Sequence, residues 1–257
     1  MLKVPEPADD DAPIFTAADM LAQRWRTSRA PKILPPHTVI IAYQRDAIAT
    51  LFKHHRHTKI DGFFGEFHVL KMHDHSIGLL HPVGPGAPIV AAAMEELIAF
   101  GVQRFIAIGL AGGLQPDLQP GDVAICDRAL RDEGTSYHYL PPARSVDANS
   151  ALVQQISAAF DARQIAHLIG ASWTTDAPYR ETRHKVEAYR AEGVKTVEME
   201  AAALFAVGQR LNVPTAAVLV IGDRLADLKW QPPIDPRPLR HSLARVAKAI
   251  SEWISSK

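Results

Sequence analysis

The sequence predicts a single-domain, three-layer α/β/α protein with a central mixed, largely parallel sheet. Apolar runs of strand length alternate with amphipathic stretches of helix length from residue 38 onward. Several strand runs end in glycines or acids, a pattern typical of the carboxyl edge of such a sheet, where ligands bind. No internal repeat is present. We therefore expect one domain over residues 37–257, preceded by an arm over residues 1–36.

The arm begins with a stretch rich in proline, aspartate and alanine. Thr16 is suited to cap a short helix over Ala17–Trp25. Three prolines, at positions 31, 35 and 36, then separate this helix from the first strand run. An arm of this kind packs on its own domain or on a neighbouring subunit more often than it carries chemistry.

Within the domain, continuous apolar runs predict strands, and amphipathic stretches predict the helices between them. The most strongly patterned helix covers Ala87–Phe100 (APIVAAAMEELIAF), and Gly101 suits its C-cap. The most apolar strand covers Pro214–Gly222. The expected elements, in order, are a strand at 38–43, a helix at 46–54, a strand hairpin at 63–72 and 76–81, a helix at 87–100, strands at 104–110 and 122–130, a helix at 150–162, a strand at 165–175, a helix at 181–191, a strand at 196–198, a helix at 199–211, a strand at 214–222 and a helix at 238–255.

The composition excludes several classes of partner. The 257 residues include 28 Lys+Arg and 28 Asp+Glu, so the formal net charge is zero, which argues against duplex nucleic acid or an anionic membrane surface. No apolar stretch reaches the roughly 18 residues of a membrane span. The acidic, proline-bearing start lacks the pattern of a signal peptide, and the single cysteine, Cys126, cannot form an internal disulfide. We expect a cytoplasmic protein that binds neither nucleic acid nor membrane.

Two glycine segments lie at the ends of predicted strands, Gly84-Pro85-Gly86 and Gly109–Gly113. Glycines let a ligand approach backbone N–H groups, and the first segment precedes a helix N-terminus, which favours anions. The spacing of a dinucleotide-binding fingerprint is absent. Without other evidence, a structural turn explains Gly109–Gly113 better than a ligand site does. For Gly84-Pro85-Gly86, a tight turn is the alternative to an anion site.

Acids occupy two other strand ends. Glu198 and Glu200, on either side of Met199, could hold a sugar diol through charged hydrogen bonds while the thioether packs on the ring. The alternative is a solvated helix start, where the helix dipole favours acids. Asp223 follows the most apolar strand, where partial desolvation would raise the pKa of a carboxyl toward that of a general acid. The alternative for Asp223 is a structural cap.

Histidines are concentrated in one stretch, since seven of the twelve lie between His54 and His81. A zinc site needs three or four nitrogen, sulfur or oxygen ligands, and Cys126 lies far away in the sequence. We therefore favour a solvated surface over a metal site for this stretch, and a buried strand position for Cys126.

Together, five segments in this order resemble the nucleoside phosphorylase superfamily, which includes purine nucleoside phosphorylases, uridine phosphorylases and methylthioadenosine/S-adenosylhomocysteine nucleosidases. The resemblance covers about residues 38–250 and implies that superfamily's α/β fold. It is carried by Gly84–Glu96 (GPGAPIVAAAMEE), Ile108–Val123 (IGLAGGLQPDLQPGDV), Thr174–Tyr179 (TTDAPY), Val197–Ala202 (VEMEAA) and Ile221–Asp223 (IGD).

The resemblance implies a role for each matching residue. Glu200 and Met199 match the pair that holds the ribose hydroxyls, and Asp223 matches the acid that serves the leaving purine. The further substrate contacts it implies are Glu198 beside the ribose, Gly109, Ala111 and Gly112 of the glycine segment, Tyr179 and Trp173 stacking on the base, His138 near the sugar 5′-hydroxyl, and Arg237 assisting the acid.

The phosphate site of the resembling family is where this sequence departs from it. Positions that carry arginine or Ser/Thr in phosphorolytic members are Ala107, Leu110 and Gly65 here. Arg45 lies one place out of register with a family arginine, and Gly84 and Gly86 are the remaining candidates for phosphate contacts. Losing bidentate arginines costs a phosphate several charged hydrogen bonds, about 1.5–3 kcal/mol each.

We therefore expect an enzyme that cleaves the N-glycosidic bond of a nucleoside, with a purine-type base favoured. Phosphate is the family's usual acceptor, and water is at least as well supported by these residues. A non-catalytic nucleoside-binding protein on the same fold is the alternative from another class. Oxocarbenium-like glycosidic cleavage needs no metal or organic cofactor. The resemblance also implies a homo-oligomer, either a dimer or a hexamer.

Overall fold

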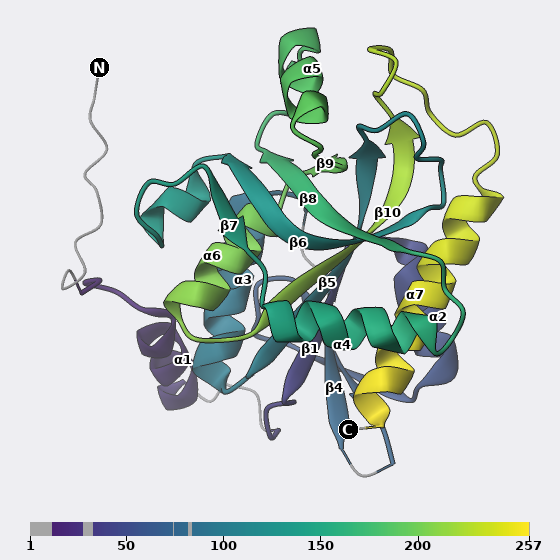
Figure 1. Cartoon of the computed structure of the whole chain (residues 1–257). Coiled ribbons are helices and arrows are strands. Elements are labelled where there is room, and N and C mark those ends of the chain that lie inside the picture. The colour runs from purple at the N-terminus through teal and green to yellow at the C-terminus, as the bar shows by residue number, and fades with distance from the viewer. Residues whose placement is uncertain (1–11, 28–32, 74, 82–83, 257) are drawn as a thin grey trace.

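The computed structural model describes residues 12–27, 33–73, 75–81 and 84–256. Within these residues a ten-stranded sheet forms the centre of the molecule, with helices on both of its faces (Figure 1). The strands are β1 (Thr38–Ala42), β2 (His57–Ile60), β3 (Glu66–Lys71), β4 (Ser76–His81), β5 (Arg104–Gly113), β6 (Val123–Asp132), β7 (Ser145–Asp147), β8 (Leu168–Thr175), β9 (Thr196–Glu198) and β10 (Thr215–Arg224). The α-helices are α1 (Ala17–Arg26), α2 (Arg45–His54), α3 (Ala87–Phe100), α4 (Ser150–Asp161), α5 (Arg183–Ala191), α6 (Ala201–Arg210) and α7 (Arg237–Ser255), with 3₁₀ turns η1 (Thr135–His138) and η2 (Pro178–Arg180).

The sheet closes on itself at one end. β5 pairs with β10, β10 with β6, β6 with β8, β8 with β9, and β9 again with β5, while β1, β4, β3 and β2 extend from β5 as an open sheet. Of the strand pairs in the described residues, five are parallel and five antiparallel. The mixed α/β fold is thus confirmed, with antiparallel pairing contributing as much as parallel pairing.

Two hydrophobic cores pack on opposite faces of the sheet and make the three layers. One contains the inward residues of α2, α4 and α7, and the other contains those of α3 and α6. α6 is buried almost all round, because eight of its residues, Ala201–Gly208, are inaccessible to solvent. A third, smaller core forms between β8, β9 and α5 around Trp173.

The carboxyl ends of three strands meet at one place. Gly112 of β5 pairs with Asp223 of β10 on one side and with Val197 of β9 on the other. A Cβ at Gly112 would lie 3.0 Å from Asp223 Oδ1 and 3.0 Å from Val197 Cγ1, so only glycine lets the three strands approach this closely. Asp223 and the acids after Val197 are brought together by this pairing.

The predicted helices and most predicted strands are observed, with differences at their ends. The glycine segment Gly109–Gly113 is not a turn, because β5 continues through it and its last two glycines pair with neighbouring strands. β2 was not expected, and it pairs with β3 at the edge of the sheet, where its side chains are mostly exposed. Met199 and Glu200 precede α6 rather than belonging to it.

The helix of the arm packs on its own domain. Thr16 caps α1 by accepting a hydrogen bond from the Asp19 N–H (3.1 Å), as the sequence predicts. Arg24 pairs with Glu96 of α3 (3.0 Å), and Leu21 is buried in the contact. Residues 1–11 and Pro31, which entered the sequence argument, lie outside the described residues.

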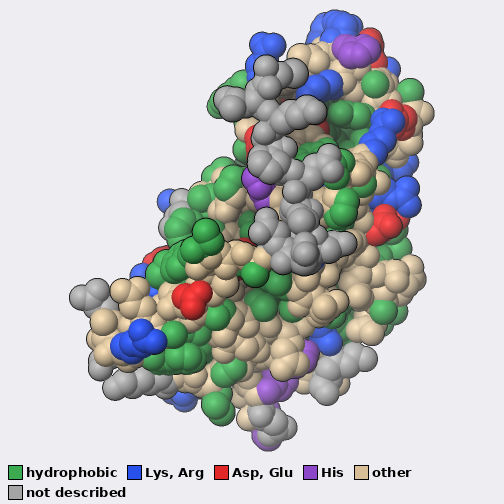
Figure 2. Space-filling model, turned by 90° about the vertical axis from the view of Figure 1, so that its left-hand side faces the viewer, with side chains coloured by type: hydrophobic (Ala, Val, Ile, Leu, Met, Phe, Trp, Pro, Cys, Tyr) green, Lys and Arg blue, Asp and Glu red, His purple; other side chains and the backbone are tan. Residues whose placement is uncertain are grey.

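Charged side chains of both signs lie on the surface. On the face in Figure 2, basic side chains gather at the top and along the upper right edge, with acidic ones among them. None of the helices in the described part of the chain combines the length and apolar character that crossing a bilayer requires.

The packing of α6 against β10 gives a test of the fold. A Cβ at Gly208 would lie 2.5 Å from Thr215 Cγ2 and 2.8 Å from the Val213 carbonyl oxygen. Gly208→Ala should therefore lower the free energy of unfolding by about 1–3 kcal/mol, although alanine is normally the better helix former. Chemical denaturation measures this, with Gly84→Ala as control because its Cβ would meet no atom within 4 Å. A stabilised Gly208→Ala variant would contradict the described packing.

Candidate functional site

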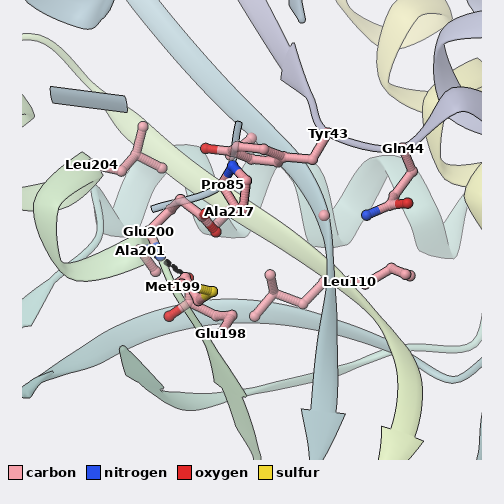
Figure 3. Close-up of a pocket in the computed structure, with 13 residues that line it drawn as sticks. Tyr43, Gln44, Pro85, Leu110, Glu198, Met199, Glu200, Ala201, Leu204 and Ala217 are labelled. Atoms are coloured by element: carbon pink, nitrogen blue, oxygen red, sulfur yellow. Dashed lines mark hydrogen bonds between the residues drawn. The ribbon is translucent and has the colours of Figure 1, made fainter. Parts of the chain in front are cut away.

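Two adjoining cavities lie at the carboxyl ends of β5, β9 and β10 and share Leu110, Glu198 and Met199. The smaller has a volume of about 130 Å³ and the larger about 820 Å³. The smaller, shown in Figure 3, is further lined by Tyr43, Gln44, Pro85, Ala107, Gly109, Glu200, Ala201, Leu204, Ala217 and Leu219. The larger is further lined by Ala111, Gly112, Pro178, Tyr179, Glu181, Val197, Gly222, Asp223, Leu225, Trp230, Pro232, Pro233 and Leu239.

Glu198 is buried at the junction of β9 and α6 and accepts four hydrogen bonds. Its Oε2 accepts from the N–H groups of Glu200 and Ala201 (both 2.7 Å), the second of which starts α6. Its Oε1 accepts from the hydroxyls of Thr174 (2.6 Å) and Ser172 (3.3 Å) on β8. Burial raises the pKa of Glu198, and these donors act in the opposite direction. Because the two N–H groups can only donate, Oε2 is an acceptor in this arrangement.

Glu200 projects into the smaller cavity, two residues along the chain from Glu198. Its Oε1 accepts a hydrogen bond from the N–H of Gly86, the N-cap of α3. The helix N-terminus that the sequence offered for a phosphate therefore holds a carboxylate of the protein itself. Burial raises the pKa of Glu200, and the charge of Glu198 raises it further.

Tyr43 follows β1 and lies across the smaller cavity (Figure 3). A Cβ at Gly109 would be 3.4 Å from Tyr43 Cδ2, so the ring rests on the backbone of β5. Its hydroxyl is buried and has no hydrogen-bond partner among the described residues. Burial, together with the charges of Glu200 and Glu198, raises the pKa of Tyr43, which keeps the phenol neutral.

The larger cavity holds a second set of polar groups at its wall. The Asp223 Oδ2 accepts a hydrogen bond from Trp230 Nε1–H at 2.6 Å. Glu181, just before α5, lines the same cavity, and burial raises its pKa to about 7, with a further contribution from the charge of Asp223. Two carboxyl groups at the wall of the larger cavity are thus close enough to interact.

Aromatic and apolar surface makes up much of the remaining wall. Tyr179 is 99% exposed and Trp230 is 67% exposed, although both line the cavity. Large aromatic side chains left uncovered around a cavity mark a place for an apolar or planar ligand. The wall is therefore suited to a flat ring with polar edges.

Most of the substrate residues predicted from the sequence come together here. Eight of them line one or both cavities: Gly109, Ala111, Gly112, Tyr179, Glu198, Met199, Glu200 and Asp223. Ala107 and Leu110, which the sequence resemblance aligns with phosphate-binding positions, also line the smaller cavity. None of the described residues that line this cavity is a lysine or an arginine.

Other predicted contacts lie away from both cavities. Trp173 is fully buried against Tyr189, with Nε1–H donating to Asp132 (2.8 Å), which removes it from the candidate base contacts. Arg237 is exposed and pairs with Asp235 (2.8 Å) rather than reaching Asp223.

The remaining four also stand outside the cavity walls, including Gly86, whose N–H is bonded to Glu200. His138 ends η1, Arg45 begins α2, and Gly84 precedes the N-cap of α3. None of these residues is among those that line either cavity.

Three cavity residues were missed as site residues, namely Tyr43, Glu181 and Trp230. Tyr43 was included only as the end of a strand, Glu181 as the start of a helix, and Trp230 lies in a segment without periodicity. A large aromatic directly after a buried strand is the one signal that could have singled out Tyr43. No local signal marks Trp230, because its role depends on a contact with Asp223 across a loop.

The histidine-rich stretch forms small contacts of its own. His57 stacks on Phe52 with ring centroids 3.9 Å apart, and His55 lies 3.2 Å from the Ser251 hydroxyl. In the part of the chain that the structure describes, no group of three His, Cys, Asp or Glu side chains is placed to hold a metal ion. Cys126 is buried on β6, and burial raises the pKa of its thiol.

The structure is thus a mixed α/β protein with a carboxylate-lined cleft at the carboxyl ends of β5, β9 and β10. Residues 40–250 match the family model described as the phosphorylase superfamily, and the chain belongs to this superfamily.

Relatives in this superfamily share about a third of the matched residues. The uridine phosphorylase of Treponema pallidum is 34% identical over 149 residues, 54% of this chain and 58% of that protein. The guanosine phosphorylase of Halorubrum lacusprofundi is 33% identical over 146 residues, 55% of this chain and 59% of that protein. The matched stretch therefore spans less than two thirds of these relatives.

Solved structures show the same fold over most of the chain. The uridine phosphorylase of Vibrio fischeri superposes with a TM-score of 0.77 at 22% identity, covering 88% of this chain and 93% of that one. The 5′-methylthioadenosine/S-adenosylhomocysteine nucleosidase of Campylobacter jejuni superposes with a TM-score of 0.75 at 18% identity, covering 86% and 100%.

The raised pKa of Glu181 makes stability depend on pH. A buried carboxyl with a pKa of about 7 binds its proton more tightly in the folded than in the unfolded chain, whose value is near 4.5. Its contribution to stability is therefore complete below pH 4.5 and is lost as the pH rises through 7.

Glu181→Gln should remove this loss. The unfolding free energy of the variant minus that of the wild type should therefore increase by on the order of 1 kcal/mol from pH 5 to pH 8. This value allows for partial screening of the Glu181 charge by solvent. Denaturant titrations at the two pH values measure the difference, with Glu187→Gln on the exposed side of α5 as control. An equal difference between variant and wild type at both pH values would rule out the raised pKa.

Proposed function

We propose that the protein hydrolyses the N-glycosidic bond of a nucleoside, with a purine-type base in the larger cavity and the ribose beside Glu200. The observation that carries this proposal is the smaller cavity. It holds Tyr43 and the carboxylates of Glu198 and Glu200, and no lysine or arginine among its described lining residues. A sugar and a water molecule suit this cavity better than a phosphate dianion does.

On the base side, Asp223 is the general acid. Breaking the bond between C1′ and the base nitrogen leaves the electron pair on the base, and a proton from Asp223 to a ring nitrogen neutralises it. The exposed faces of Tyr179 and Trp230 stack on the flat ring. A cavity of about 820 Å³ accommodates a two-ring base, and the match of Asp223 to the purine-serving acid supports the same choice.

On the sugar side, Glu200 holds the ribose hydroxyls while Met199 packs on the ring. Positive charge develops on the sugar as the base departs, and carboxylates at the hydroxyls stabilise it. Glu198 acts on this step through position alone, because both of its oxygens are already occupied by donors.

The acceptor is a water molecule in the smaller cavity. About 130 Å³ is ample for water, and the Tyr43 hydroxyl and Glu200 carboxylate supply polar partners. A buried hydroxyl without a partner costs about 1–3 kcal/mol, which a bound water would relieve. The water oxygen bonds to C1′, and its proton passes to the Glu200 carboxylate, which lines the same cavity.

Phosphorolysis is the second candidate, with one specific observation in its favour. The relatives at 34% and 33% identity are named as phosphorylases of uridine and guanosine. Against it, the Gly86 N–H is donated to Glu200 and Arg45 does not line the cavity.

As the superfamily resemblance implies, we also propose that the protein is a homo-oligomer, a dimer or a hexamer. We propose in addition that it is cytoplasmic, which its single cysteine favours.

The decisive experiment incubates the protein with purine and pyrimidine ribonucleosides, with and without phosphate, and identifies the sugar product. We expect free ribose from a purine nucleoside at a rate independent of phosphate. Ribose 1-phosphate would overturn the hydrolytic proposal in favour of phosphorolysis. Tight nucleoside binding by calorimetry with no product after long incubation would identify a binding protein.

Asp223→Asn tests the general acid. The variant keeps the shape of the side chain but has no acidic proton, so kcat should fall by about 10²–10⁴-fold. Asp161→Asn at the exposed end of α4 is the control and should keep full activity. Unchanged turnover in Asp223→Asn would show that another group protonates the base.

Tyr43→Phe tests the acceptor site. Removing only the hydroxyl takes one hydrogen bond from the attacking water, so free-ribose formation should fall by about tenfold with little change in KM. Tyr137→Phe is the control, because the Tyr137 hydroxyl donates to the Arg131 carbonyl (2.9 Å) outside both cavities. A variant as fast as the wild type would place the water elsewhere.

A further inference from the structure

The segment between β10 and α7 begins as a short hairpin over residues 224–231. Arg224 and Gln231 pair as an isolated bridge, with Arg224 N–H donating to Gln231 O (3.0 Å) and Gln231 N–H to Arg224 O (2.9 Å). At the turn, Leu228 has φ +58° and its N–H donates to Leu225 O (2.9 Å). The hairpin therefore has a defined conformation.

This hairpin is tied to the domain at two further points. Leu225 N–H donates to the carbonyl of Gly113 at the end of β5 (2.9 Å). The guanidinium of Arg190 on α5 donates to the carbonyl of Ala226. One anchor is a backbone carbonyl of β5 and the other is a side chain of α5, and together they hold the hairpin in place beside the cleft.

Trp230 lies on this hairpin and is exposed, yet its one polar atom, Nε1, makes a hydrogen bond within the protein. Two thirds of the side chain (67%) is open to solvent, and its Nε1–H donates to Asp223 Oδ2 at 2.6 Å. Packing in a core does not explain its place, because none of the three hydrophobic cores includes it. The contacts that place Trp230 are the hairpin and the carboxyl of Asp223.

The two oxygens of Asp223 have different surroundings as a result. An indole nitrogen can only donate, so Oδ2 accepts and carries no proton in this contact. Oδ1 lies on the side of Gly112, where a Cβ would be 3.0 Å away. A proton on Asp223 in this geometry is therefore on Oδ1, beside the glycine floor of the larger cavity.

We propose that Trp230 is a positioning residue that holds the Asp223 carboxyl through Oδ2 and directs the proton on Oδ1 toward the base. This inference rests on the proposed function and specifies its base side. It also assigns to an indole the assisting role that the sequence resemblance gave to Arg237, which the structure pairs with Asp235. The indole ring also provides one of the proposed stacking faces. Substitutions can therefore separate the hydrogen bond to Asp223 from the stacking on the base.

Two variants separate these contributions in the nucleoside assay. Trp230→Phe keeps a flat ring and removes the N–H, so kcat should fall by about tenfold while KM stays within about twofold. Trp230→Ala also removes the stacking face, so KM should rise by about tenfold in addition. Trp25→Phe on α1, where the ring is 57% exposed and outside the cleft, is the control and should match the wild type. Because Trp230 is exposed, thermal unfolding of all three variants should stay close to that of the wild type.

A spectroscopic readout tests the contact without any turnover. In a ¹⁵N–¹H correlation spectrum, the indole N–H signal that disappears in Trp230→Phe belongs to Trp230. Asp223→Ala removes its acceptor, so this signal should move upfield, while Asp161→Asn should leave it in place. A signal unmoved by Asp223→Ala, or a Trp230→Phe variant with wild-type kcat, would overturn the inference. If the wild type releases no base from any nucleoside, the proposed function fails, and the indole signal still decides whether Trp230 holds Asp223.

Discussion

The buried carboxylate of Glu198 is the interaction on which the candidate site depends. A carboxylate placed out of water is very costly unless donors surround it, and Glu198 has two backbone amides at the start of α6 and two hydroxyls from β8. These bonds determine where β9 ends and where α6 begins. They thereby determine where Met199 and Glu200 point. Glu200 then joins α3 through Gly86, so one chain of carboxylate contacts links β8, α6 and α3 around the smaller cavity.

The two cavities differ in chemistry, and this difference explains the proposed division of labour. The smaller is acidic and holds a buried phenol, which suits a sugar that becomes positively charged and a neutral water molecule. The larger is mostly apolar with exposed aromatic rings and two interacting carboxyls, which suits a flat base that must receive a proton. Asp223 lies on the wall between sheet and loop, and its partner across the loop is an indole rather than a guanidinium. The protein has no net charge, and both cavities contain carboxyl groups. These features are consistent with an uncharged nucleoside as the ligand.

Much of the fold could be predicted because its elements are locally consistent. Ala87–Phe100 was predicted with the observed bounds, since its apolar pattern and Gly101 C-cap agree. β2 could not be predicted, because His57–Ile60 is an exposed edge strand whose polar residues carry no alternation toward a core. The Gly109–Gly113 segment was taken for a turn, because glycine is the usual turn residue. Its last glycines extend β5 instead, where two neighbouring strands approach too closely for a side chain.

The α/β class, the superfamily resemblance and eight residues that line the cleft could all be predicted from the amino-acid sequence. These depend on local patterns and on motifs at strand ends, which a chain carries regardless of how distant segments pack. Packing between distant segments placed the Glu200 carboxyl on the Gly86 amide and Tyr43 in the smaller cavity. It also placed the Trp230 N–H on Asp223 and buried Trp173. The physical reason is that each of these is a contact between side chains and backbone far apart in the sequence. The direction of such a side chain is set by the elements packed around it, and no local pattern records it.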